Sequence, residues 1–179
     1  MSKIKCLVSG LFAILLASMF SSCTSSRRAM KSQGAATSMA VQQLTPEQQR
    51  KYDYFFLEAA RLKAQGKYDA AFDLYKHSLS IAPSASSALY EISQYYQYLG
   101  QADQGLDALK RAVENAPGNY WYSQALAGIY QQQNKTDEAI AVLESMTTRF
   151  PNKQESLFAL MDLYAKQQNY EKLIATLDR

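Results

Sequence analysis

The chain has 179 residues, of which 47% are hydrophobic, and a formal net charge of +3. This positive balance comes from residues 1–45, because residues 46–179 carry 14 basic and 16 acidic side chains, a net of −2. Nucleic-acid-binding domains carry a basic surface, so the charge argues against one in the folded part. Two cysteines are also too few for a disulfide-stapled framework.

Residues 1–22 have the pattern of a secretory signal peptide. Lys3 and Lys5 make a positive start, and a mainly apolar run over 6–20 follows them. A run of this length is too short to cross a bilayer comfortably, whereas it matches the core of a signal peptide. We therefore expect residues 1–22 to be removed, with a short N-terminal membrane helix as the alternative.

The segment Phe20-Ser21-Ser22-Cys23 resembles the lipobox of bacterial lipoproteins, with Phe20 in place of the more usual leucine. The resemblance implies diacylation of the Cys23 sulfur and acylation of its new amino group. Each buried methylene of an acyl chain such as palmitate contributes about 0.8 kcal/mol, so two or three chains would anchor the protein to a membrane. Ordinary cleavage that leaves Cys23 as a free thiol is the alternative.

Residues 23–45 are small and polar with few large apolar side chains, which predicts a flexible tether behind the lipidated cysteine. Lipoproteins with aspartate directly after the cysteine tend to stay in the inner membrane, and Thr24 stands at that position here. The resemblance therefore implies a lipid-anchored protein of the cell envelope, on the outer membrane more than the inner. The lack of an acidic patch beside Cys23 favours the periplasmic face.

The rest of the sequence repeats at a fixed interval, which separates Pro83 from Pro117 and Pro117 from Pro151. Tyrosines, small residues and turn residues keep the same interval, in three sets: Tyr96, Tyr130 and Tyr164; Ala71, Gly105 and Ala139; Gly66, Gly100 and Asn134. A constant period of about 34 residues is the signature of a helical repeat architecture.

Each period predicts a helix, a tight turn and a second helix. In the first period we expect helices over 54–64 and 68–81, joined by a turn at Gly66. Pro83 ends the second helix, because proline lacks an amide hydrogen and disfavours helical geometry at Ala82. Thr45, followed by proline and then by Gln48, makes a capping-box pattern that marks the start of the repeats.

This pattern resembles the tetratricopeptide repeat (TPR). The first copy carries it in Phe55, Ala59, Leu62, Gly66, Tyr68, Ala71, Tyr75, Ser78 and Pro83. The resemblance implies an all-α fold, a right-handed superhelix of helical hairpins in which each repeat contacts only its neighbours. The repeats are expected at 46–84, 85–118 and 119–152, with an incomplete fourth at 153–179. Glu58, where a leucine is usual, is one departure from the family pattern.

The resemblance also implies a concave groove lined mainly by the first helix of each hairpin. Aromatic and amide residues at the groove positions are Phe56, Tyr90, Gln94, Gln97, Tyr98, Trp121, Gln124, Gln131 and Phe158. Tyrosine and tryptophan anchor many protein interfaces, and glutamine can hydrogen-bond an extended peptide in either sense. The groove is therefore interpreted as a binding surface for a protein segment. Packing between neighbouring hairpins is the alternative for any one of these side chains.

We expect no enzyme activity, metal site or cofactor in residues 46–179. His77 is the only histidine, and no catalytic partner can be placed beside it. The expected partners are a protein and, through the lipid anchor, a membrane, with no nucleic acid and no small-molecule substrate.

The favoured interpretation is an outer-membrane assembly or secretion accessory. Two alternatives stay open. One is a carbohydrate-capture lipoprotein, in which Tyr98 and Trp121 would stack on sugars. The other is the N-terminal TPR module of a longer protein, since Arg179 falls inside the second helix of the fourth copy.

Overall fold

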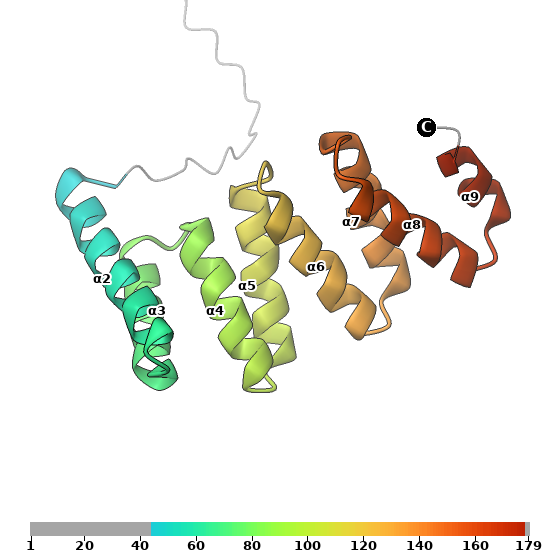
Figure 1. Ribbon diagram of the computed structural model, residues 1–179. Coiled ribbons are helices and arrows are strands. Elements are labelled where there is room, and N and C mark those ends of the chain that lie inside the picture. The colour runs from blue at the N-terminus through green and yellow to red at the C-terminus, as the bar shows by residue number, and fades with distance from the viewer. Residues whose placement is uncertain (1–43, 178–179) are drawn as a thin grey trace, which may run out of the picture. The chain divides into compact units, whose positions relative to one another are not determined.

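The computed structural model describes residues 44–177, which belong to one compact unit and form eight α-helices (Figure 1). The expected signal peptide, Cys23 and nearly all of the expected tether lie outside the described residues. No strand occurs between residues 44 and 177. The helices are α2 (Pro46–Ala64), α3 (Tyr68–Ile81), α4 (Ser86–Tyr98), α5 (Ala102–Asn115), α6 (Tyr120–Gln132), α7 (Thr136–Arg149), α8 (Gln154–Lys166) and α9 (Tyr170–Leu177).

The helices pair into four hairpins, α2–α3, α4–α5, α6–α7 and α8–α9, and the hairpins stack in sequence order (Figure 1). Consecutive hairpins touch through α3 and α4, α5 and α6, and α7 and α8. Each hairpin therefore buries its apolar face against its neighbours, as the helices of a solenoid do. The expected all-α fold of helical hairpins is confirmed.

The first helix is longer than the sequence indicated. The prediction placed it over 54–64, whereas α2 begins at Pro46. The cause is the capping box: the Gln48 amide donates to Thr45 Oγ1 at 3.2 Å, and the Thr45 amide donates to Gln48 Oε1 at 2.9 Å. These bonds satisfy two amides that a helix start leaves without intrahelical partners, so the helix begins there. The second helix of this hairpin spans 68–81, as expected.

The turn inside each hairpin uses a residue in the left-handed region. Gly66 and Gly100 have φ of 76° and 72°, and Asn134 has φ of 57°, as its place in the period predicted. The amide after each of these residues donates to a carbonyl five positions earlier, for example Lys67 to Leu62 at 3.0 Å. The fourth turn places Gln168 at φ 56°. Glutamine has no particular tolerance for this conformation, so the fourth turn is strained.

We expect Gln168→Gly to raise the stability of the fourth hairpin by about 0.5–1 kcal/mol, because glycine adopts positive φ without steric cost. Gln167→Gly is the matched control. Gln167 has φ of −79°, so glycine there adds only chain entropy in the unfolded state and should lower stability. Thermal unfolding followed by circular dichroism measures both variants. A fall in stability for Gln168→Gly would contradict the strained turn.

Small residues let the helices of a hairpin approach closely. Ala71 and Ala139 are fully buried, and Gly105 is buried at the same place in the second hairpin. A Cβ added at Gly105 would lie 2.5 Å from Gln97 Nε2 and 3.1 Å from the Ser93 carbonyl oxygen. Glycine is therefore the residue that fits where α4 and α5 pack most tightly.

The core repeats with the same period. Tyr75, Leu109 and Leu143 occupy the same place in successive repeats and are 1%, 0% and 3% exposed. Leu177 continues this series on α9 and is 62% exposed, because no described hairpin packs on that side. The same position is thus fully buried or open according to whether a following hairpin covers it.

Candidate functional site

The predicted groove residues all lie on the first helix of a hairpin: one on α2, four on α4, three on α6 and one on α8. Six are solvent-exposed, namely Gln94, Tyr98, Trp121, Gln124, Gln131 and Phe158. Three are half-buried, namely Phe56, Tyr90 and Gln97. In the solenoid the first helices of neighbouring hairpins, α2, α4, α6 and α8, lie in one row (Figure 1). We call the solvent-exposed side of this row the groove row.

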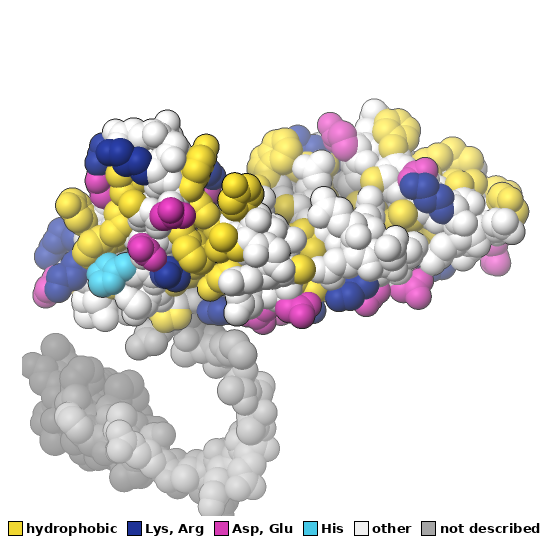
Figure 2. Space-filling model, turned by 90° about the horizontal axis from the view of Figure 1, so that it is seen from below, with side chains coloured by type: hydrophobic (Ala, Val, Ile, Leu, Met, Phe, Trp, Pro, Cys, Tyr) yellow, Lys and Arg dark blue, Asp and Glu magenta, His cyan; other side chains and the backbone are white. Residues whose placement is uncertain are grey.

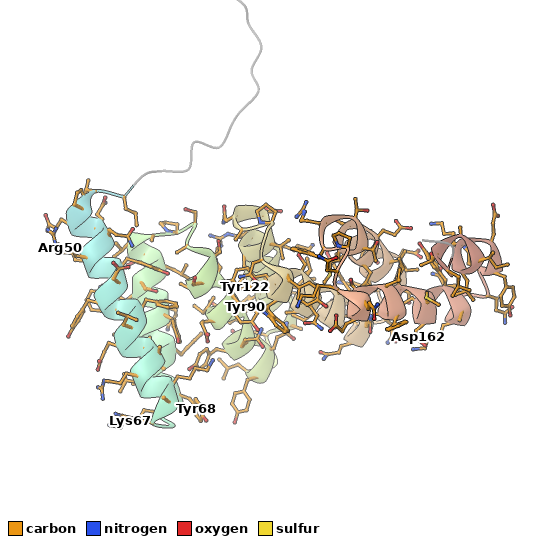
Figure 3. All side chains as sticks on the ribbon, turned by 45° about the horizontal axis from the view of Figure 1, so that its top comes forward. Arg50, Lys67, Tyr68, Tyr90, Tyr122 and Asp162 are labelled. Carbon is orange, nitrogen blue, oxygen red and sulfur yellow. The ribbon has the colours of Figure 1, made fainter. Side chains whose placement is uncertain are left out.

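Aromatic stacking links neighbouring helices along this row. The rings of Tyr90 on α4 and Tyr122 on α6 stack at 4.8 Å with 26° between their planes, and they lie side by side in Figure 3. Tyr52 stacks on Phe56 at 5.6 Å on α2. Burial, followed by the charges of Asp53 and Tyr122, raises the pKa of Tyr52 to about 12. Tyr52 is therefore neutral at physiological pH and presents an uncharged ring and hydroxyl.

A cavity of about 320 Å³ lies where the end of α2, the start of α3 and the end of α4 meet. Two of the predicted residues, Gln94 and Tyr98, line it. The other lining residues are Lys63, Tyr68 and Tyr95. We call it the tyrosine pocket. Hydrophobic side chains gather on the surface toward the first hairpins, with charged groups among them (Figure 2).

Charge in the tyrosine pocket is balanced. Lys63 Nζ lies 2.6 Å from Glu91 Oε2. Burial acts to lower the pKa of Lys63, but the hydrogen bond and charge of Glu91 raise it above its ordinary value. Burial raises the pKa of Tyr95, whose hydroxyl has no hydrogen-bond partner among the described residues. The pocket thus holds a compensated ion pair and a neutral, unmatched hydroxyl.

A second cavity, of about 220 Å³, lies between α6, α7 and α8. Gln124 and Gln131 from the predicted set line it, together with Gly128, Tyr120 and Glu155 among others. The Tyr120 hydroxyl is buried without a partner in the described structure. Burial, and then the charge of Glu155, raise its pKa. This cavity therefore offers two side-chain amides that lie about two helical turns apart on α6.

The Trp121 ring lies 5.3 Å from the ring of Tyr120, which lines this cavity, and Trp121 is 62% exposed. The Lys153 ammonium lies 5.2 Å from the centre of the Tyr120 ring and 5.9 Å from that of Trp121. A cation over an aromatic face attracts it weakly when exposed to solvent. Lys153 therefore covers the Trp121 indole only in part, and most of the indole surface stays exposed to solvent on the groove row.

Two of the predicted residues make contacts inside their own hairpins. Gln97 Nε2 donates to the Ala102 carbonyl oxygen at 3.4 Å and lies against Gly105. The Phe56 ring meets the Tyr75 ring edge-on at 5.6 Å. Neither residue lines the two cavities described above. The binding role of all nine residues stays a prediction. Exposure to solvent supports it for six of them more than for the three half-buried ones.

Sequence reasoning missed Tyr68 and Tyr95 as pocket residues. Tyr95 follows Gln94 on a helix and lies outside the groove positions, and its ring packs on Phe72 at 5.4 Å. Tyr68 begins the second helix of its hairpin, which the groove pattern does not include. Only the crossing of three helices brings these rings together.

In residues 44–177, no group of three or more His, Cys, Asp or Glu side chains could hold a metal ion. His77 is exposed, and its ring meets the Phe55 ring edge-on at 4.2 Å. Among the helices of the described part, none is both long enough and apolar enough to cross a membrane.

Comparisons with known proteins agree with this geometry. Residues 96–152 match a family model described as tetratricopeptide repeat. Among curated proteins, no match was found. A solved structure of MamA AMB-1 superposes with a TM-score of 0.61 at 19% sequence identity, over 71% of this chain and 69% of the other.

Two further solved structures have the same architecture. MamA from Desulfovibrio magneticus RS-1 gives a TM-score of 0.57 at 15% identity, over 71% of this chain and 72% of the other. A tetratricopeptide repeat protein from Parabacteroides merdae gives 0.63 at 18% identity, over 72% of this chain but only 52% of the other. At these identities the likeness concerns the fold, and the described residues form a helical solenoid of the tetratricopeptide type.

Proposed function

We propose that this protein is a membrane-anchored scaffold that binds a segment of another protein along the groove row. One observation carries the proposal: α4, α6 and α8 each present a large aromatic side chain to solvent, where the repeat pattern places groove positions. These are Tyr98, Trp121 and Phe158, which are 88%, 62% and 61% exposed. Large exposed aromatics that recur at groove positions are typical of interaction surfaces.

The polar side chains between these aromatics support a peptide ligand. Gln94, Gln124 and Gln131 are exposed on the same helices. An amide side chain donates and accepts, so it can pair with either the N–H or the C=O groups of an extended backbone. An ion-pairing mode has less support, because Lys63, the charged residue that lines the tyrosine pocket, is already paired with Glu91 at 2.6 Å.

Site-specific photo-cross-linking in the native envelope tests this proposal. Benzoylphenylalanine in place of Trp121 is expected to yield a discrete protein adduct, which mass spectrometry identifies. Benzoylphenylalanine in place of Ala141, an exposed residue on α7, is the control and should yield none. Adducts from Ala141 alone would place the partner on the second helices and contradict the proposal.

We also propose that the protein is a lipoprotein of the outer membrane that faces the periplasm. Acyl chains on Cys23 would be its membrane anchor. Labelled palmitate should enter the wild-type protein, and Cys23→Ser should abolish this incorporation and release the protein from the membrane fraction. A single acyl chain binds a membrane only reversibly, whereas two or three hold it permanently. Label that persists in Cys23→Ser would refute the anchor. In the envelope, the scaffold would serve the assembly or secretion of other envelope proteins.

A further inference from the structure

The tyrosine pocket has a chemistry that a general peptide groove does not need. Three tyrosine rings line it, contributed by α3 and α4. Tyr68 and Tyr98 are 58% and 88% exposed, so their ring faces are open to a ligand. Tyr95 lies deeper, and its ring packs on Phe72 and Tyr75 at 5.4 and 5.9 Å. The pocket therefore combines one buried tyrosine ring, packed on two neighbouring rings, with two solvent-exposed tyrosine rings.

The pocket does not attract a charged ligand. The only basic group in its lining is Lys63, which is already paired with Glu91 at 2.6 Å. A ligand carboxylate would compete with Glu91, and a ligand ammonium would compete with Lys63. Separating the pair would leave one charge without its partner, which is costly where solvent is partly excluded. Charge complementarity thus favours a neutral ligand group.

The pocket also has a hydrogen-bond donor to offer. The Tyr95 side chain is 9% exposed, and its hydroxyl has no partner among the described residues. A buried donor without an acceptor carries a free-energy cost that a ligand acceptor would remove. Lys63 lies close enough for its charge to act on this hydroxyl. The Lys63 side chain lines the same pocket and is 42% exposed, so the pocket opens to solvent beside the ion pair.

We propose that the tyrosine pocket receives a proline of the extended partner segment, an inference that rests on the proposed groove binding. A proline ring is compact, apolar and neutral, and proline-rich segments dock on aromatic-lined surfaces through their preformed extended helix. Proline has no amide hydrogen, so such a segment brings carbonyl acceptors and buries no unmatched donor. A backbone carbonyl beside the proline accepts from Tyr95, while Tyr68 and Tyr98 flank the ring.

Fluorescence anisotropy with the full chain tests this assignment. The probe is a labelled peptide of repeated Ala-Pro-Pro units, and the comparison peptide has alanine at every proline position. The proline peptide should bind at least tenfold more tightly. Tyr98→Ala should weaken its binding by about tenfold or more, as loss of an aromatic anchor does. Tyr170→Ala, which removes a 60% exposed tyrosine from α9, should leave binding within twofold.

Tyr95→Phe separates recognition from folding. The variant keeps the ring and removes only the hydroxyl, so it should weaken proline-peptide binding by about two- to tenfold. Its melting temperature should stay unchanged or rise, because an unmatched buried hydroxyl is lost. Unchanged binding by Tyr95→Phe would overturn the hydrogen bond, and equal binding of the two peptides would overturn the proline assignment.

Three other outcomes also decide between the proposals. A labelled oligosaccharide that bound through Tyr98, with no binding of the proline peptide, would make the pocket a sugar site and refute the proposal. If the proline peptide fails to bind while Trp121 still gives its cross-linked adduct, only the proline assignment fails. Loss of the cross-link as well would remove the groove function itself.

Discussion

Leu109→Ala lowers the free energy of unfolding by about 2–5 kcal/mol, the range for emptying a fully packed leucine site. Leu109 lies on α5 with 0% of its surface exposed, and it belongs to the core cluster formed by the second to fourth hairpins. Truncation removes apolar contacts on both sides of a hairpin interface at once. Urea unfolding followed by circular dichroism measures the loss.

The chain provides a control at the equivalent place in the period. Leu177 lies two periods beyond Leu109, and it is 62% exposed on α9. Leu177→Ala should therefore change stability by less than about 0.5 kcal/mol, as surface substitutions do. Equal losses in the two variants would mean that intrinsic helix preference sets stability. That result would contradict stacking of hairpins as the source of the fold's stability.

A double change on the groove row, Trp121→Ala with Phe158→Ala, should weaken binding of the cross-linked partner by about 700-fold, the sum of two anchor losses in free energy. Aromatic anchors that dominate an interface each contribute about 2 kcal/mol or more, and about 1.4 kcal/mol corresponds to tenfold in affinity. Both side chains are more than half exposed, so the free protein should keep its stability within about 0.5 kcal/mol. Titration of the purified partner by calorimetry measures the change.

The matched control for this change lies on α2. Tyr54 and Leu57 are each 65% exposed, comparable to Trp121 and Phe158, but they are outside the predicted groove set. Tyr54→Ala with Leu57→Ala should leave the affinity within twofold. If this control weakens binding as much as the groove change does, the partner contacts the first hairpin's outer surface and the groove assignment is wrong.

The architecture could be predicted from the sequence because it depends on local rules repeated at a fixed interval. Pro83, Pro117 and Pro151 each follow the end of a helix. Gly66, Gly100 and Asn134 each occupy a left-handed turn. Backbone geometry sets these requirements residue by residue, so a single sequence displays them. The superposition on solved structures confirms the all-α fold of helical hairpins that they predicted.

Two local features were missed for physical reasons. The full length of α2 depends on the reciprocal bonds between Thr45 and Gln48, because residues 46–53 are mostly polar and lack the apolar periodicity that predicts a helix. Gln168 adopts a left-handed conformation that its side chain does not favour. The hairpin contacts of α8 and α9 impose this turn, and tertiary contacts of that kind override a residue's own preference.

The site could be predicted only in outline. Repeat position assigned the groove residues to the correct helices, but it could not tell Gln97, held against Gly105, from Gln94, which lines the tyrosine pocket. Nor could it bring Tyr68 and Tyr95 into one cavity, since they come from different helices of neighbouring hairpins. Such pockets depend on the angles at which neighbouring helices cross, and the spacing of residues along the sequence does not give those angles.

Hydrogen–deuterium exchange with and without the cross-linked partner tests the central proposal most directly. Binding along the groove row should slow exchange most in α4, α6 and α8, because contacts that favour the folded state suppress local opening. Smaller changes are expected in α3, α5 and α7. The largest protection in those three second helices, with α4, α6 and α8 unchanged, would contradict a scaffold that holds its partner in the groove.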